Sequence, residues 1–339
     1  MSKKDAALFW DTAHRYLDHH LKVIRQVSSH TIDSYRDCLN SFINYLEEVE
    51  HINRKRISFH NFKKETLKRY QSWMITERSL APKTCNLRMT AIRAFLEYAA
   101  QEYLWVMPIY TDACNIDGVK TTNPVIEYFE PNEMAALLAA PSGNNKTDRR
   151  NQMMLIFLYD TAARVAEARQ VKVSDLHLDA EVPYVTLLGK GRKYRNIPLL
   201  EKTILHARRY LKEFHGSDLK SDAPLFYSKT HGEIHRLSSD TFEKMIKRYA
   251  DQCRADGCPM PDHVHCHMVR KTRAMDLYRE GVPLAHIQQL LGHENISTTS
   301  GFYAFATLDV LAKAMETVSP DEGVKSWSDP DTLERLYRL

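Results

Sequence analysis

Apolar residues recur every three or four positions through the N-terminal third of the chain, which is the spacing of one face of an α-helix. The pattern predicts three long helices, within residues 30–50, 62–78 and 83–105. Thr31 or Ser29 is the expected N-cap of the first, because a hydroxyl there can accept a hydrogen bond from a free backbone N–H. The apolar stripe of the third helix consists of Leu87, Ile92, Phe95, Leu96 and Ala99. This part of the chain is therefore expected to fold as a small all-helical bundle.

The helical pattern breaks over residues 111–129, where Gly118 and Pro124 stand among threonine and asparagine. This composition predicts an extended linker. Pro131 then suits the first turn of a new helix. Residues 151–171 predict a strongly apolar helix at the centre of a second core.

Residues 182–199 show a different pattern, in which apolar and polar positions alternate on either side of a Gly-Lys-Gly turn. Alternation around such a turn predicts a β-hairpin, and the pattern beyond it returns to helix. We expect a mainly α-helical protein with a small β-sheet. Its predicted parts are a helical domain at 1–112, a linker at 113–126, an α+β domain at 127–318 and a C-terminal tail at 319–339.

The composition sets few limits on function. The 339 residues suffice for two domains with separate cores. The 47 basic and 43 acidic residues leave a net charge of +4, which is weak support for nucleic-acid binding because clustering decides it. Six scattered cysteines fit a reducing compartment. The sequence shows no secretory signal, and no apolar run approaches the roughly 18 residues of a membrane span. We expect a cytoplasmic protein with no membrane partner.

Two segments in the middle of the chain carry side chains suited to chemistry. Arg164 and Glu167 lie three residues apart at the end of the apolar helix. An arginine beside such a helix needs an anionic partner or ligand, because an unpaired buried charge is costly. The tip of the predicted hairpin presents Lys190, Arg192 and Lys193.

Two later segments complete the set. His267 and Arg270 are three residues apart and so share one face of a helix. Gly292 is expected to end a helix, and His293 follows it directly. Tyr303 lies ten residues after His293, in the next predicted helix.

Taken in order, Arg-x-x-Glu, the GKGRK hairpin, His-x-x-Arg, Leu-Gly-His and a downstream tyrosine resemble the catalytic domain of tyrosine recombinases. This family includes phage integrases, Xer-type resolvases and mobile-element recombinases. The resemblance covers about residues 5–318 and is strongest over 155–199 and 263–305. Each motif alone is weak, and their order makes the signal specific. The N-terminal bundle similarly resembles the family's core-binding, SAM-like domain, which forms a C-shaped clamp around DNA with the catalytic domain.

The resemblance implies a reaction as well as a fold. The hydroxyl of Tyr303 would attack a DNA phosphodiester, giving a 3′-phosphotyrosyl bond and a free 5′-hydroxyl that later reverses the step without ATP. Arg164 and Arg270 would hold the nonbridging phosphate oxygens, since planar guanidinium groups bind them in pairs. Lys190 would protonate the leaving oxygen, and His267 would help accept the tyrosine proton.

The remaining roles also follow from the resemblance. His293 would donate to the phosphate, and Glu167 would orient the cations. Because positive side chains supply the stabilisation, no metal and no cofactor is implied. The chain departs from the family pattern in having Lys271 where many relatives have histidine, and some relatives place the tyrosine nine residues after the histidine. Lys193 competes with Lys190 for the acid role, although Lys190 matches the family position better.

Basic residues of the N-terminal bundle lie off its apolar stripes, where they could meet DNA phosphates. A solvated face with no ligand explains them equally well. With the hairpin tip, the candidate DNA contacts are Lys63, Lys64, Lys68, Arg69, Lys83, Arg88, Arg93, Arg192 and Lys193.

The candidate residues also have purely structural interpretations. Arg164 would form an ion pair with Glu167, His293 would cap a helix, Tyr303 would fill a core, and Lys190 would be an ordinary surface lysine. A second cluster suggests a structural zinc site, although its spacing lacks a CxxC pair and fits no common finger. It consists of Cys253, Cys258, His263, His265 and Cys266.

We therefore predict a site-specific recombinase, of the integrase, transposase or Xer type, acting on duplex DNA with inverted sites as a tetramer. Two alternatives share parts of this prediction: a type IB topoisomerase-like enzyme that relaxes DNA, and a catalytically silent DNA-binding protein. The apolar residues of the 319–339 tail suggest docking on a neighbouring protomer, with packing on its own domain as the alternative. The sequence does not predict the target DNA sequence, the direction of the reaction or any accessory proteins.

Overall fold

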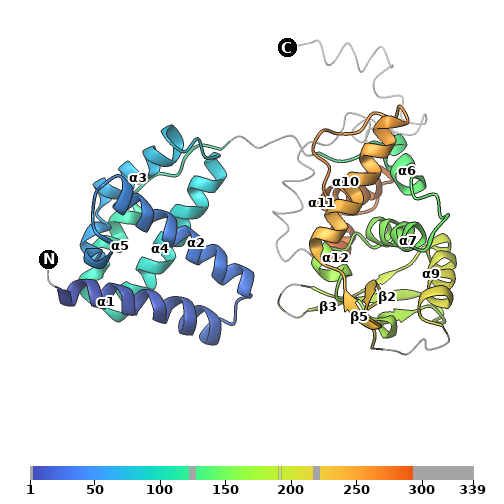
Figure 1. Ribbon diagram of the computed structural model, residues 1–339, viewed down its shortest axis with the longest axis horizontal. Coiled ribbons are helices and arrows are strands. Elements are labelled where there is room, and N and C mark those ends of the chain that lie inside the picture. The colour runs from blue at the N-terminus through green and yellow to red at the C-terminus, as the bar shows by residue number, and fades with distance from the viewer. Residues whose placement is uncertain (1–2, 122–126, 190, 192, 217–221, 293–339) are drawn as a thin grey trace, which may run out of the picture. The chain divides into compact units, whose positions relative to one another are not determined.

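The structure is a computed structural model and describes residues 3–121, 127–189, 191, 193–216 and 222–292. The chain divides into two compact units, residues 1–124 and 125–339, each with its own hydrophobic core (Figure 1). The mainly α-helical fold with small antiparallel sheets confirms the predicted fold class.

The first unit is all-helical over its described residues. Helix α1 (Lys3–His14) continues into the π-helical η1 (Arg15–Ile24). The other α-helices are α2 (Ser29–Glu48), α3 (Lys64–Thr76), α4 (Pro82–Glu102) and the shorter α5 (Met107–Cys114). Helix α4 packs against α2, α3 and α5, so it forms the centre of the bundle. The core is rich in aromatic rings, among them Phe9, Phe42, Phe62 and Phe95, which contact one another at ring-centroid distances of 4.8–6.2 Å.

The periodicity located these helices well, with two local errors. The N-cap of α2 is Ser28, whose side chain accepts from the backbone N–H of Thr31, so neither Thr31 nor Ser29 is the cap. Leu87 lies on the outer surface of α4 and is 54% exposed, whereas the other four predicted inner residues are buried. Leu87 lies in the second turn of α4, so few apolar residues precede it in the helix and the position of the buried face is poorly defined there.

The first residues of the predicted 113–126 linker belong to the first unit. Helix α5 continues to Cys114, and the chain beyond it is tied to the bundle by two amide side chains. Asn86 donates to the carbonyl of Val119 at 2.9 Å and accepts from its N–H at 2.8 Å, while Gln71 donates to the carbonyl of Asp117. The described part of the linker is therefore held in place up to Val119.

The second unit has seven described α-helices, besides the 3-10 helix η5 (Val173–Asp175). They are α6 (Pro131–Ala139), α7 (Lys146–Thr161), α8 (Val165–Ala168), α9 (Glu201–Phe214), α10 (Ser239–Ala255), α11 (Cys266–Arg279) and α12 (Leu284–Leu291). Helix α6 begins with Pro131 at its first turn, as predicted. Helix α7 packs against both α9 and α11 and is the buried centre of the unit (Figure 1).

Two small antiparallel sheets accompany these helices. The first has the order β1 (Leu176–His177), β2 (Tyr184–Leu188) and β3 (Tyr194–Pro198), and the second pairs β4 (Tyr227–Thr230) with β5 (Glu233–Arg236). Strands β2 and β3 form the predicted hairpin, with Leu187 opposite Arg195 and Val185 opposite Ile197. Opposed residues share a face of a sheet, so Arg195 lies on the same face as buried apolar side chains.

The apolar helix predicted over 151–171 is interrupted. Helix α7 ends at Thr161, and Ala162 adopts a left-handed conformation with φ of 48°. A new short helix, α8, begins at Val165. The expectation that Arg164 and Glu167 lie at the end of one continuous helix is wrong, because the chain turns at Ala162 and places both on α8 and its N-cap.

Candidate active site

Glu167 is the centre of the described site and is 4% exposed. It accepts four hydrogen bonds. Two come from Arg164, through its backbone N–H and its Nη1, both at 2.8 Å. Two come from Arg195, whose Nη1 and Nη2 donate to the two carboxylate oxygens at 2.9 and 2.8 Å. The paired contacts with Arg195 have the fork-to-fork geometry in which arginine binds carboxylate most strongly.

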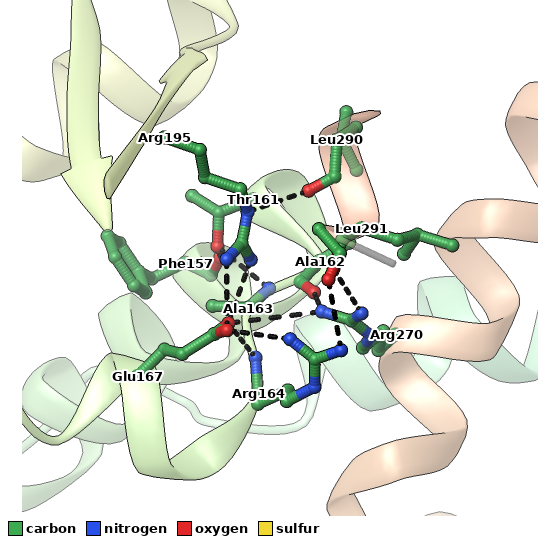
Figure 2. Close-up of polar contacts among 11 residues, drawn as sticks. Phe157, Thr161, Ala162, Ala163, Arg164, Glu167, Arg195, Arg270, Leu290 and Leu291 are labelled. Atoms are coloured by element: carbon green, nitrogen blue, oxygen red, sulfur yellow. Dashed lines mark hydrogen bonds and ion pairs between the residues drawn. The ribbon is translucent and has the colours of Figure 1, made fainter. Parts of the chain in front are cut away.

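Arg270 reaches the same carboxylate from α11. Its Nη1 lies 3.9 Å from Glu167 Oε2 and donates to the carbonyl of Ala162 at 2.8 Å. Its Nη2 donates to the carbonyl of Leu291 at the end of α12. The left-handed turn at Ala162 thus presents a carbonyl that fixes the guanidinium. Three guanidinium groups approach the Glu167 carboxylate from different sides in Figure 2.

The site carries an excess of positive charge. Among the described residues, three permanently charged arginines surround one carboxylate, so these charges do not cancel. The side chains of Arg270 and Arg195 are 3% and 12% exposed, whereas that of Arg164 is 34% exposed. Arg164 is therefore the guanidinium most open to a ligand, and a cluster of this composition favours an anion such as a phosphate.

Neighbouring arginines determine the ionisation of Glu167. Burial alone would raise its pKa, but the hydrogen bonds and charge of Arg195 and the bonds from Arg164 outweigh burial and lower the pKa to about 2. The carboxylate is thus ionised throughout the physiological range. The ionised state of Glu167 does not decide between a structural ion pair with Arg164 and a phosphate-binding site, because both require a negative charge on Glu167.

Removing the carboxylate should cost much of the stability of the second unit. We predict that Glu167→Ala lowers the free energy of unfolding by about 3–5 kcal/mol, because it leaves buried guanidinium groups without their counter-charge. Urea unfolding of the variant and the wild type measures the difference. The matched control is Glu213→Ala, since Glu213 also pairs bidentately with an arginine (Arg149) but at the surface, where about 1 kcal/mol or less is expected. Equal losses in the two variants would contradict the central position of Glu167.

His267 lies on the first turn of α11 and keeps an exposed surface. Loss of solvation and the positive charges of Arg270 and Lys271 lower its pKa to about 4. The imidazole is therefore neutral at pH 7 in the DNA-free protein. A neutral ring nitrogen can accept a proton, which is the state that a general base requires.

The low pKa of His267 predicts a pH dependence of stability. In the unfolded chain histidine titrates near 6.5, so between pH 6.5 and 4 the unfolded state binds more protons, and stability falls as the pH is lowered through this window. We predict that His267→Asn removes this part of the slope. Urea unfolding at several pH values checks it, and wild type and variant with parallel curves from pH 4 to 6.5 would refute the assignment.

The hairpin contributes described residues on either side of its tip. The N–H of Gly189 donates to the carbonyl of Lys193 at 2.8 Å, which closes the turn, and the side chain of Lys193 is exposed. Lys190 and Arg192 lie outside the described residues.

Helix α12 ends as predicted at Gly292, which has a left-handed φ of 61°. The carbonyl of Gly292 lies 3.5 Å from Nη2 of Arg164, so this helix end borders the cation cluster. His293 and Tyr303 follow in the sequence and lie outside the described residues, as does the 319–339 tail.

The candidate DNA contacts of the first unit differ in their surroundings. Lys63, Lys68 and Lys83 are exposed, and Lys64 is partly buried. Arg88 donates to the hydroxyl of Ser41 at 2.7 Å. Two further basic residues bind the protein itself: Arg69 pairs with Glu50, and Arg93 donates to the carbonyls of Ala113 and Ile116. Arg69 and Arg93 therefore have contacts within the protein, and their phosphate contact stays a prediction.

Arg195 is the functional candidate that the sequence analysis missed. It binds both oxygens of Glu167 and donates through Nε to the carbonyl of Leu290 at 2.9 Å. A signal for it was present, because alternation along the second hairpin strand places Arg195 on the face of Ile197. A charged residue on the apolar face of a strand needs a partner of opposite charge.

No group of three or more His, Cys, Asp or Glu side chains among the described residues is placed to hold a metal ion, the cluster around Cys258 included. All six cysteines of the chain are in described segments and none is in a disulfide. Within the same described segments, no helix combines the length and apolar character needed to cross a membrane.

Comparison with known proteins identifies the family. Residues 127–307 match the Phage integrase family, and residues 14–103 match the Phage integrase N-terminal SAM-like domain. A protein of Sinorhizobium fredii named as an integrase/recombinase, y4rC, is 30% identical over 91% of this chain and 90% of its own length. Tyrosine recombinase XerD of Halalkalibacterium halodurans is 32% identical over 83% of this chain and 89% of its own length. The chain therefore belongs to the phage integrase family of tyrosine recombinases, enzymes of site-specific DNA recombination.

A solved structure agrees with this assignment at the level of the fold. The XerH site-specific recombinase, in a post-cleavage complex with its palindromic difH substrate, superposes with a TM-score of 0.67 at 22% identity. The match covers 87% of this chain and 82% of that chain. The recognised resemblance is thus confirmed, and DNA is the partner on which the enzyme acts.

Proposed function

We propose that the arginine cluster around Glu167 binds the scissile phosphate of a duplex recombination site, where the chain cuts and rejoins one strand through a 3′-phosphotyrosyl bond. The observation that carries this proposal is the convergence of Arg164, Arg195 and Arg270 on one buried carboxylate, an excess of positive charge among the described residues, with Arg164 the most exposed of the three. Developing negative charge on a transferring phosphoryl group is stabilised by such preorganised donors.

In the proposed cleavage step, Tyr303, His267 and Lys190 each take part in one bond change. The Tyr303 oxygen attacks phosphorus, and the bond from phosphorus to the 5′-oxygen breaks. The tyrosine proton passes to His267, and Lys190 protonates the leaving 5′-oxygen. His267 is neutral at pH 7 in the free protein, as this direction of proton transfer requires. The reverse sequence rejoins the strand, and the bond energy is conserved throughout.

The other groups hold the phosphate. Arg164 and Arg270 donate to its nonbridging oxygens, and His293 donates a further hydrogen bond. Glu167 does not touch the phosphate in this proposal. Its four hydrogen bonds orient the arginines, and its own charge keeps their mutual repulsion low.

We assign the first unit, predicted as 1–112 and extended by the fold through Val119, to a core-binding clamp domain, followed by the rest of the predicted 113–126 linker and the catalytic domain at 127–318. Lys63, Lys64, Lys68, Lys83, Arg88, Arg192 and Lys193 are the proposed backbone contacts. The match to XerH, which was solved on a palindromic substrate, supports inverted sites. Two such sites bound by four protomers would give the tetramer that recombination requires, and the proposed setting is the cytoplasm.

We propose that the tail at 319–339 docks on a neighbouring protomer of that tetramer. A chain lacking residues 320–339 should then bind a single site with nearly unchanged affinity and assemble poorly on paired sites. Native gel shifts with one-site and two-site duplexes measure both. Normal recombination by the truncated chain would refute docking in trans.

The experiment for the function begins by finding a substrate. Rounds of binding selection from a pool of duplexes with random sequence yield the preferred site, and a nick placed in its centre lets the short cleaved end diffuse away. We expect a covalent protein–DNA band on a denaturing gel, formed in EDTA, because protein cations supply the stabilisation. Relaxation of plasmid without recombination, or binding without an adduct, would favour the topoisomerase-like or the silent alternative.

A further inference from the structure

Arg195 occupies a socket built from three segments that are distant in the sequence. Its Nη1 and Nη2 bind Glu167 of α8, and its Nε donates to the carbonyl of Leu290 of α12. Its own backbone belongs to β3 of the hairpin. One guanidinium group therefore joins the hairpin, the α8 carboxylate and the end of α12, with every contact drawn in Figure 2.

Two glycines leave room for this guanidinium. A Cβ atom at Gly189 would lie 3.2 Å from Arg195 Nη1 and 3.3 Å from the carbonyl oxygen of Lys193. A Cβ atom at Gly292 would lie 3.1 Å from the same Nη1 and 3.3 Å from Cδ. Ordinary contacts of this kind begin at 3.4 Å, so a side chain at either position would press on Arg195. Glycine is therefore needed at both positions, the first glycine of the GKG turn and the glycine of Leu-Gly-His, for the same reason: a larger residue would press on Arg195.

Both glycines stand directly before a proposed catalytic residue. Lys190 follows Gly189 and His293 follows Gly292 in the sequence. We propose that Arg195 is a positioning residue. It fixes the backbone at Gly189 and Gly292, the residues before Lys190 and His293. This aligns the general acid and the histidine donor with the phosphate-binding pair Arg164 and Arg270. This inference rests on the proposed function, because it takes the roles of Lys190 and His293 from it.

The planar fork of arginine is needed for this task. The guanidinium makes the three bonds in different directions at once, to two carboxylate oxygens and one carbonyl. A lysine at this position keeps the charge but offers a single nitrogen without the fork. Arg195→Lys therefore removes alignment while it retains electrostatic attraction to Glu167.

The direct test compares Arg195→Lys and Arg195→Met with the wild type in single-turnover adduct formation on the selected nicked duplex. We expect the cleavage rate to fall about 100-fold, since misplacement by about 1 Å costs this much. The dissociation constant for DNA should change less than about threefold, because the phosphate-facing Arg164 remains. The matched control is Arg149→Lys, which loses a similar bidentate pair with Glu213 outside the site.

A pH profile distinguishes positioning from simple support of the fold. The bonds from Arg195 hold down the pKa of Glu167 against the effect of burial, so their loss raises that pKa. The acid limb of the cleavage rate should then move to higher pH in both Arg195 variants. A purely structural role would lower the fraction of active protein and leave the profile unchanged, which would overturn the proposal.

A second pair of variants keeps Arg195 in place. Gly292 and Gly281 both have positive φ, 61° and 81°, but a Cβ atom at Gly281 would meet no atom within 4 Å. Gly292→Ala and Gly281→Ala therefore share the backbone strain, and only Gly292→Ala displaces the guanidinium. We expect a cleavage rate at least about 10-fold lower for Gly292→Ala than for Gly281→Ala, in line with the cost of misplaced groups. Equal cleavage rates for the two variants would contradict the positioning role of Arg195.

Hydrogen exchange in DNA-free protein tests the same proposal without chemistry. The backbone of residues 184–195 should exchange faster in Arg195→Lys and Gly292→Ala than in Arg149→Lys and Gly281→Ala, because the hairpin base has lost its tie to α8 and α12. Unchanged exchange in all four variants would refute the positioning role. Should the wild type form no adduct, the proposed function fails while exchange still decides whether Arg195 joins the three segments.

Discussion

Replacing Tyr303 with phenylalanine should abolish the covalent adduct and leave DNA binding intact. Phenylalanine keeps the ring and removes only the hydroxyl that attacks phosphorus. The single-turnover cleavage rate should fall by at least about 10⁴-fold, because no other route to a covalent intermediate remains. Gel shifts should give a dissociation constant within about twofold of the wild type, since the phosphate contacts come from basic side chains.

The matched control for this variant is Tyr194→Phe. Tyr194 is 71% exposed on the hairpin of the second unit, so its ring carries a hydroxyl that no described part of the core needs. We expect its loss to leave adduct formation unchanged. Full cleavage by Tyr303→Phe, or loss of cleavage in Tyr194→Phe, would assign the nucleophile to another residue.

Replacing Arg164 with alanine should lower cleavage more than it lowers stability. Arg164 is the most exposed arginine of the cluster and faces the proposed phosphate. Its removal should reduce the adduct rate about 10³-fold, or about 4 kcal/mol, the upper range for one preorganised donor to a developing anion. Stability should fall by about 1 kcal/mol, because Glu167 keeps both bonds from Arg195 and the backbone bond from residue 164.

Arg169→Ala provides the comparison for this prediction. Arg164 and Arg169 stand at the N-cap and C-cap of α8 and are both partly buried, but Arg169 bonds to the carbonyl of Leu237 and the hydroxyl of Ser239. The Arg169 variant should lose some stability and cleave at close to the wild-type rate. Equal cleavage rates for the two variants would show that the guanidinium of Arg164 does not act on the phosphate.

The sequence predicted those elements whose pattern is local. Strand alternation around the Gly-Lys-Gly turn located the β2–β3 hairpin, and apolar spacing located α2, α3 and α4. Gly292 marked the end of α12, because glycine tolerates the left-handed conformation found there. Each of these signals depends on neighbours within a few residues.

The break after α7 had no local signal of this kind. Ala162 adopts a left-handed conformation that alanine disfavours. It is held there by tertiary contacts, since its carbonyl accepts a bond from Arg270, 108 residues further along the chain. Helix propensity alone continues α7 through this position, and the prediction of one continuous helix failed for that reason.

The site was predicted in part. The motifs selected Arg164, Glu167 and Arg270, and the structure brings these three together. They did not show that Glu167 also binds Arg195, because the pairing spans 28 residues and depends on how the hairpin meets α8. The internal contacts of one basic residue of the bundle were likewise not predictable, since only the fold shows that Arg93 donates to the carbonyls of Ala113 in α5 and Ile116 after it.

Locating the covalent bond between protein and DNA identifies the nucleophile directly. The adduct trapped on the selected nicked duplex is digested with trypsin, and the peptide that carries the residual nucleotide is fragmented in a mass spectrometer. We expect the nucleotide on peptide 280–313, which contains a single tyrosine, with the phosphate on Tyr303. A nucleotide on any other residue, or on another peptide, would contradict this assignment.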